Sequence, residues 1–146
     1  MASDIDIQKN VVDDVIAQLV AQGVSDPVYR EGTQQDPIYP SVAVNVLNEN
    51  DELPAETGIS GFHRLDIEID AQTYSPVDGD TTAAQALLGD CRGAFSWDDI
   101  LAQMNALSAF NTYLYLATSN SDQYTEDRVN HRKLAIQILM RPSNEK

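Results

Sequence analysis

The chain has few of the side chains that catalysis and metal binding use. Its 146 residues include one cysteine, Cys91, and two histidines, His63 and His131. One cysteine cannot form an intramolecular disulfide, and these three residues lack the spacing of a metal site. The sequence also has no glycine-rich phosphate loop and no nucleophile elbow. We therefore expect no enzymatic activity, no catalytic residues, no bound metal and no cofactor.

Basic residues are also scarce, since nine lysines and arginines face 23 acidic residues and give a formal net charge of −14. Such a body repels the phosphates of duplex DNA, which argues against a surface that binds nucleic acid. Two other relations to DNA stay open: an acidic lumen that DNA passes without sticking, or mimicry of DNA. The alternative is that the charge serves solubility alone.

No hydrophobic run approaches the length of a membrane span, and the acidic N-terminus does not look like a signal peptide. We expect no membrane association and synthesis in a reducing cytoplasm. The length fits one domain over residues 1–146.

The clearest pattern is a strict alternation between residues 62 and 71. One face carries His63, Leu65, Ile67, Ile69 and Ala71, and the other carries Arg64, Asp66, Glu68 and Asp70. Strand side chains point to opposite faces with a period of two, so one face is predicted to join a core. The row Asp66, Glu68 and Asp70 is then predicted to meet water, a wet lumen or a cationic partner, because unpaired carboxylates are costly to bury.

The remaining periodicities predict an α+β fold, a single-domain antiparallel β-sheet with helices packed on one face. Expected helices span 4–22, 81–93 and about 97–107, the last with Trp97 inside, and further strands span 41–47, 110–118 and 128–140. Residues 27–40, 48–58 and 119–127 are expected to be irregular or loops.

Two groups of residues are candidates for contacts with other subunits. Tyr29 and Tyr39 lie in the proline-interrupted stretch 27–40, which either forms a contact surface or merely covers a sheet edge. Arg128, Arg132 and Lys133 concentrate basic charge in the acidic chain. They either steer assembly with a neighbour or pair locally with Glu126 and Asp127.

The order of these elements resembles the tail terminator, or tail completion, proteins of long-tailed bacteriophages. The likeness rests on the N-terminal amphipathic helix, the Pro-Tyr segment entering a strand at 36–44, the strand 65–73 followed by an alanine-rich helix at 81–92, and the final strand 133–140. The loop 48–58 and the inserted helix that contains Trp97 do not match this layout.

The resemblance implies a structural virion protein in the tail or neck, made in the host cytoplasm. It implies a homo-oligomeric ring, usually a hexamer, that stops growth of the tail tube and contacts the tail tube protein and the head–tail connector protein. DNA would pass through without specific binding. The alternatives are a head–tail adaptor or neck protein, an acidic DNA-mimic inhibitor and, last, a small enzyme.

Overall fold

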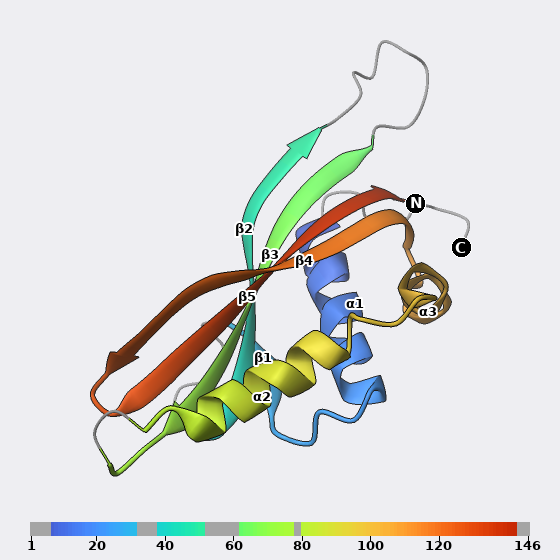
Figure 1. Ribbon diagram of the computed structural model, residues 1–146. Coiled ribbons are helices and arrows are strands. Elements are labelled where there is room, and N and C mark those ends of the chain that lie inside the picture. Colours follow the sequence, from blue (N-terminus) through green and yellow to red (C-terminus); the bar gives the residue numbers. More distant parts are fainter. Residues whose placement is uncertain (1–6, 32–37, 52–61, 78–79, 143–146) are drawn as a thin grey trace.

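The computed structural model describes residues 7–31, 38–51, 62–77 and 80–142, and they form one α+β domain (Figure 1). Three helices and five strands follow one another as α1 (Ile7–Ala21), β1 (Val28–Arg30), β2 (Ser41–Asp51), β3 (His63–Tyr74), α2 (Thr82–Gly93), α3 (Ile100–Leu107), β4 (Asn111–Glu126) and β5 (Val129–Pro142). The predicted fold class is therefore confirmed.

The strands form one twisted sheet in the order β1-β2-β3-β5-β4. The pairs β2–β3, β3–β5 and β4–β5 are antiparallel, whereas β1 pairs with β2 in parallel. The predicted antiparallel sheet is therefore correct except at this short edge strand. In Figure 1 the three helices lie on one side of the sheet, as expected.

The core lies between the helices and the predicted apolar face of the sheet. Fully buried side chains come from alternate positions of β3 and β5 and from one stripe of α1: Leu65, Ile67, Ile69, Leu134, Ile136, Ile138, Val11, Val15 and Leu19. Both periods, two in the strands and about 3.6 in the helix, are those read in the sequence. Gly23 follows α1 with φ +95°, the left-handed conformation expected after a helix C-terminus.

Several sequence expectations were wrong. Residues 119–126 form the second half of β4 instead of a loop, because Asp127 and Arg128 adopt φ values of 51° and 64° and make the tight turn to β5. The stretch 27–40 contains β1. The third helix begins at Ile100 and leaves Trp97 54% exposed instead of buried.

Two other expectations fall partly outside the described residues. Positions 4–6 of the first helix and 52–58 of the acidic loop lie there, while β2 extends through 48–51. None of the described helices has the length and apolar character needed to cross a membrane.

Candidate functional site

The sheet face opposite the helices carries Asp66, Glu68 and Asp70, and we call it the open face. These residues alternate along β3 with the buried Leu65 and Ile67, so the predicted separation into an apolar and an acidic face is present. The acidic side chains are only partly accessible. Asp70 is buried, with 9% exposure, while Asp66 and Glu68 are half-buried.

Strand β5 supplies partners for two of the three carboxylates. The Nζ atom of Lys133 lies 3.2 Å from Oε1 of Glu68, and Nδ1 of His131 lies 2.9 Å from Oδ2 of Asp70. The amide of Gln72 also donates a hydrogen bond of 2.9 Å to Asp70. Lys133 of the same chain thus supplies part of the cationic partner that was expected for the acidic row.

The pairing of Lys133 with Glu68 affects the titration of the ammonium group. Partial burial lowers the pKa of Lys133, but the hydrogen bond and negative charge of Glu68, with a further contribution from Asp70, outweigh it. The net result is a pKa above the usual value, so Lys133 is charged throughout the neutral range.

Tyr124 of β4 completes this network and was missed by the sequence analysis. Its ring stacks on His131 with centroids 4.4 Å apart and an interplanar angle of 14°, and the Lys133 Nζ atom lies 5.0 Å from its ring centroid. Tyr124 could have been predicted if the β4–β5 hairpin had been continued to its turn, because that register places Tyr124 opposite His131.

The two tyrosines predicted as contact residues, Tyr29 and Tyr39, lie together at the end of the open face that carries Asp70 and Gln72. The hydroxyl of Tyr29 donates to Oε1 of Gln72 at 3.4 Å and lies 3.5 Å from the hydroxyl of Ser41. Burial, followed by the proximity of Tyr29 and then of Asp70, raises the pKa of Tyr39. The structure therefore brings Tyr29, Tyr39 and the acidic row together on one surface.

At the other end of the open face, Asp66 borders a shallow groove of about 350 Å³. The groove is also lined by the small or apolar side chains of Leu47, Ala117 and Ala135. Leu47 is 52% exposed and lies at a β-bulge in β2. Asp66 makes no ion pair with any described residue, so its charge stays available to whatever faces this groove.

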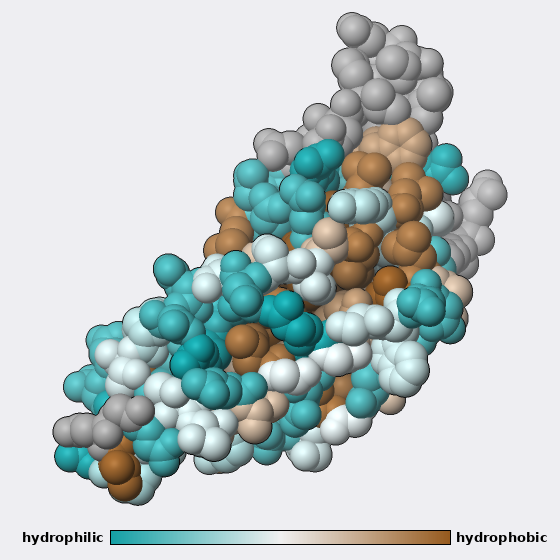
Figure 2. All heavy atoms as spheres, viewed as in Figure 1, coloured by the Kyte–Doolittle hydropathy of each residue, from teal (hydrophilic) through white to brown (hydrophobic). Residues whose placement is uncertain are grey.

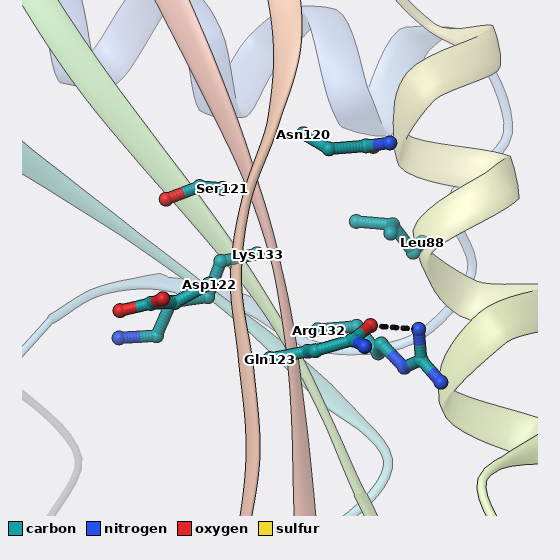
Figure 3. Close-up of a pocket in the computed structure, with 7 residues that line it drawn as sticks. All are labelled: Leu88, Asn120, Ser121, Asp122, Gln123, Arg132 and Lys133. Atoms are coloured by element: carbon teal, nitrogen blue, oxygen red, sulfur yellow. Dashed lines mark hydrogen bonds between the residues drawn. The ribbon is translucent and has the colours of Figure 1, made fainter.

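The three predicted basic contact residues do not form one cluster. Lys133 belongs to the open face, whereas Arg132 lies on the helix side, where it donates to Gln123 and, at 3.2 Å, to the hydroxyl of Thr81. Figure 3 shows Arg132 and Gln123 on the opposite side of the strands from Lys133. Arg128 donates to the carbonyl of Pro76, and in the described part of the chain none of the three pairs with an acidic neighbour in the turn.

No group of three potential metal ligands gathers among the described residues. Cys91 is buried on α2, and burial, with the charges of Asp90 and Asp26, raises the pKa of its thiol to about 12. A thiol so protonated is a poor nucleophile.

The open face carries hydrogen-bonding, aromatic and acidic groups, and such a surface is suited to contact with another macromolecule.

No protein-family model matches the chain, and no curated protein matches its sequence. Among solved structures the fold matches a chain in the virion of a native gene transfer agent particle, with a TM-score of 0.63 and 14% identity over 92% of this chain and 97% of that one. A second solved chain, 15% identical and covered almost completely, reaches a TM-score of 0.48, too low to support an argument. The chain therefore shares the fold of a component of a phage-like particle.

Proposed function

We propose that this protein is a structural component of a phage-like virion and has no enzymatic activity. The observation that carries the proposal is the end-to-end match with a chain of a gene transfer agent virion, since 92% of this chain superposes on 97% of that one. The lack of a convergent acid, base and nucleophile in the described residues supports the same proposal.

Within the virion we propose the position of a tail terminator, a ring of subunits, hexameric by resemblance, at the head-proximal end of the tail tube. The ring would contact the tail tube protein on one side and the head–tail connector protein on the other. The order of elements that first suggested this family is retained in the structure, from α1 through the paired strands to β5. The protein would be made in the host cytoplasm and reside in the tail or neck.

We further propose that the open face, with Asp66, Glu68 and Asp70, lines the lumen through which DNA passes. A negative surface repels phosphates and so allows DNA to slide without being held. The ion pair of Glu68 with Lys133 and the hydrogen bond between Asp70 and His131 favour a lumen over DNA mimicry. A mimic needs a fully exposed array of charges, and here two of the three carboxylates are engaged within the sheet.

Deletion of the gene tests the assignment, with the resulting particles viewed by electron microscopy. A terminator is expected to leave tail tubes of uncontrolled length and no joined tails, because nothing stops tube growth. Tails of normal length that fail to join heads would instead identify a head–tail adaptor. Particles that assemble normally without the protein would reject the structural role and favour an inhibitor acting on a DNA-binding enzyme.

A further inference from the structure

Several basic side chains of the described residues differ in the kind of group that they bind. Five are bound to carboxylates: Lys9, Arg30, His63, His131 and Lys133. Arg92 and Arg132 instead bind only neutral groups, Arg92 the side-chain oxygen of Asn120 and Arg132 the side chains of Gln123 and Thr81. Arg128 also binds a neutral group, the carbonyl of Pro76, but Arg92 and Arg132 differ from it because both contact residues that line one groove, Asn120 and Gln123.

Arg132 lines a groove beside α2, and Arg92 reaches the same groove through its hydrogen bond to Asn120, another lining residue. The groove has a volume of about 400 Å³ beside α2 and the outer strand β4. Its lining residues are Leu88, Asn120, Ser121, Asp122, Gln123, Arg132 and Lys133. Figure 3 shows the side chains of Leu88, Asn120, Gln123 and Arg132 converging from α2 and the two strands. Because β4 has a bulge between Asn120 and Gln123, the strand bends here and opens the space.

Each guanidinium has donors left for another acceptor. Arginine carries five N–H donors in a planar fork, and the neutral contacts of Arg92 and Arg132 use only part of them. The fork fits a carboxylate with two parallel hydrogen bonds. On the face seen in Figure 2, hydrophilic side chains surround a small hydrophobic patch in the region of α2. An apolar side chain next to a carboxylate would match this surface.

The loop between α2 and α3 of the same chain carries an apolar side chain next to two carboxylates. Trp97, 54% exposed, is followed by Asp98 and Asp99, which are both exposed. Asp99 accepts a hydrogen bond from Gln103, whereas Asp98 has no ion-pair partner among the described residues. Exposed tryptophans are enriched among the residues that dominate binding energy at protein interfaces.

We propose that the groove beside α2 receives the loop Trp97–Asp99 of a second copy of this chain. Trp97 would pack on Leu88, and Asp98 would accept hydrogen bonds from Arg132 and Arg92. Groove and loop are different surfaces of the same chain, so the contact is heterologous, the kind that closes into a ring when the rotation allows. The inference rests on the proposed ring and names the residues that join its subunits.

The charge of the chain explains why such a contact would be needed. Copies with a net charge of −14 repel one another, so association requires a place where opposite signs meet. Complementary charges at an interface also fix its orientation and exclude wrong partners. Asp122 also lines the groove, but Figure 3 shows it on the opposite side of the strands from Arg132. No carboxylate of the described residues pairs with Arg92 or Arg132, so an acid of a second copy can approach both.

Sedimentation of the full chain at low ionic strength tests the proposal. The double variant Arg92→Glu/Arg132→Glu and the variant Asp98→Arg are each expected to raise the dissociation constant of self-association by at least about tenfold. Combining all three substitutions is expected to restore association, since the signs are then exchanged. Arg141→Glu, an exposed arginine at the end of β5, is the matched control and should behave as the parent.

Two further variants separate binding from folding. Arg92→Gln/Arg132→Gln keeps hydrogen-bonding capacity toward the neutral partners and should weaken association with unchanged thermal unfolding. Trp97→Ala should weaken association without changing its salt dependence, because the indole carries no charge.

Several results would overturn the inference. Association that is equal in parent and arginine variants, or charge exchange that fails to restore it, would reject the pairing. A parent chain that stays monomeric up to about 1 mM would also reject it, while the deletion experiment would still decide the virion role. Binding of duplex DNA by the parent that is lost in the arginine variants would assign the groove to phosphates instead.

Discussion

Lys133 on β5 and Glu68 on β3 form an ion pair of 3.2 Å across the open face of the sheet, with side-chain exposures of 16% and 13%. The pair lies diagonally, since Lys133 is directly opposite Asp70 in the strand register. One lysine therefore compensates two neighbouring carboxylates, which explains how an acidic row can occupy a half-buried sheet face.

Replacement of Glu68 by Gln is expected to lower the free energy of unfolding at neutral pH by about 1 kcal/mol or less, because the pair is partly accessible to water. The raised pKa of Lys133 sets the pH dependence. The contribution of the pair is fully present below the usual lysine value of 10.5 and is lost as the pH rises through the higher folded-state pKa. Urea unfolding from neutral pH to about 11 should therefore show a smaller alkaline loss in the variant than in the parent.

Glu126→Gln, at an exposed position near the β4–β5 turn, is the control for removing one negative charge. It should leave the alkaline limb of the stability curve unchanged. An identical alkaline loss in Glu68→Gln and the parent would mean that the pair contributes nothing to stability.

A hydrogen bond between Tyr113 and Asp14 lies in the core and can be tested by mutation. The hydroxyl of Tyr113, which is 2% exposed, donates to Oδ2 of Asp14 on α1, and Asn111 donates to the same oxygen at 3.3 Å. Burial, with the adjacent negative charge of Asp14, raises the pKa of Tyr113, so the hydroxyl stays a donor. Tyr113→Phe is expected to cost about 1–3 kcal/mol, because a buried carboxylate loses a donor.

Chemical denaturation measures this cost, and Tyr115→Phe is the matched control because Tyr115 is 51% exposed. The control should lie within about 0.5 kcal/mol of the parent. Equal stability of the two variants would show that the buried hydrogen bond has no net value.

The sequence predicted the parts of the fold in which one face is strongly apolar. The alternation around Leu65, Ile67 and Ile69 and the stripe of α1 survive in the structure, because burial of apolar side chains enforces both periods. The acidic face followed from the same alternation. The side chains that bind these carboxylates could not be predicted in this way. They come from β5, which lies beside β3 although the paired residues are about sixty positions apart in the sequence.

The errors around the β4–β5 hairpin share one physical cause. The second half of β4 is polar and exposed on both faces, so no hydrophobic period marks it; its strand form comes from backbone pairing with β5. Its turn residues, Asp127 and Arg128, are not the Asn-Gly or Asp-Gly pairs that usually signal a tight hairpin. Tyr124 was missed for this reason, and Trp97 was misplaced because its helix starts three residues later than expected.

Cys91 gives a probe of global unfolding. Its thiol is fully buried and its pKa is raised to about 12, so at neutral pH it is protonated as well as inaccessible. We expect a disulfide reagent such as dithionitrobenzoate to label the native protein only as fast as the protein unfolds, and to label it at once in urea. Rapid labelling of the folded chain would contradict the packing of α2 against the sheet.

Asp66 is the residue of the open face best suited to test whether this face lines a lumen. Of Asp66, Glu68 and Asp70 it is the one that binds no basic side chain among the described residues, so Asp66→Lys should leave the fold intact, whereas lysine at Glu68 would face Lys133. If the open face lines the DNA path, a ring of lysines at position 66 should hold phosphates and slow DNA ejection from triggered particles. The effect should fade with salt, because the Debye length falls from about 10 Å at 0.1 M to about 3 Å at 1 M.

Asp90→Lys is the control, since it makes the same charge change at an exposed position on α2, on the other side of the sheet. Particles with this variant should eject DNA as the parent does at both salt concentrations. Equal ejection by the Asp66→Lys and Asp90→Lys particles would place the open face away from DNA, because a row of about six added positive charges around a duplex cannot leave its passage unchanged. The acidic row would then face outward, and the half-buried network of Glu68, Lys133 and His131 would serve the contact with a neighbouring virion protein.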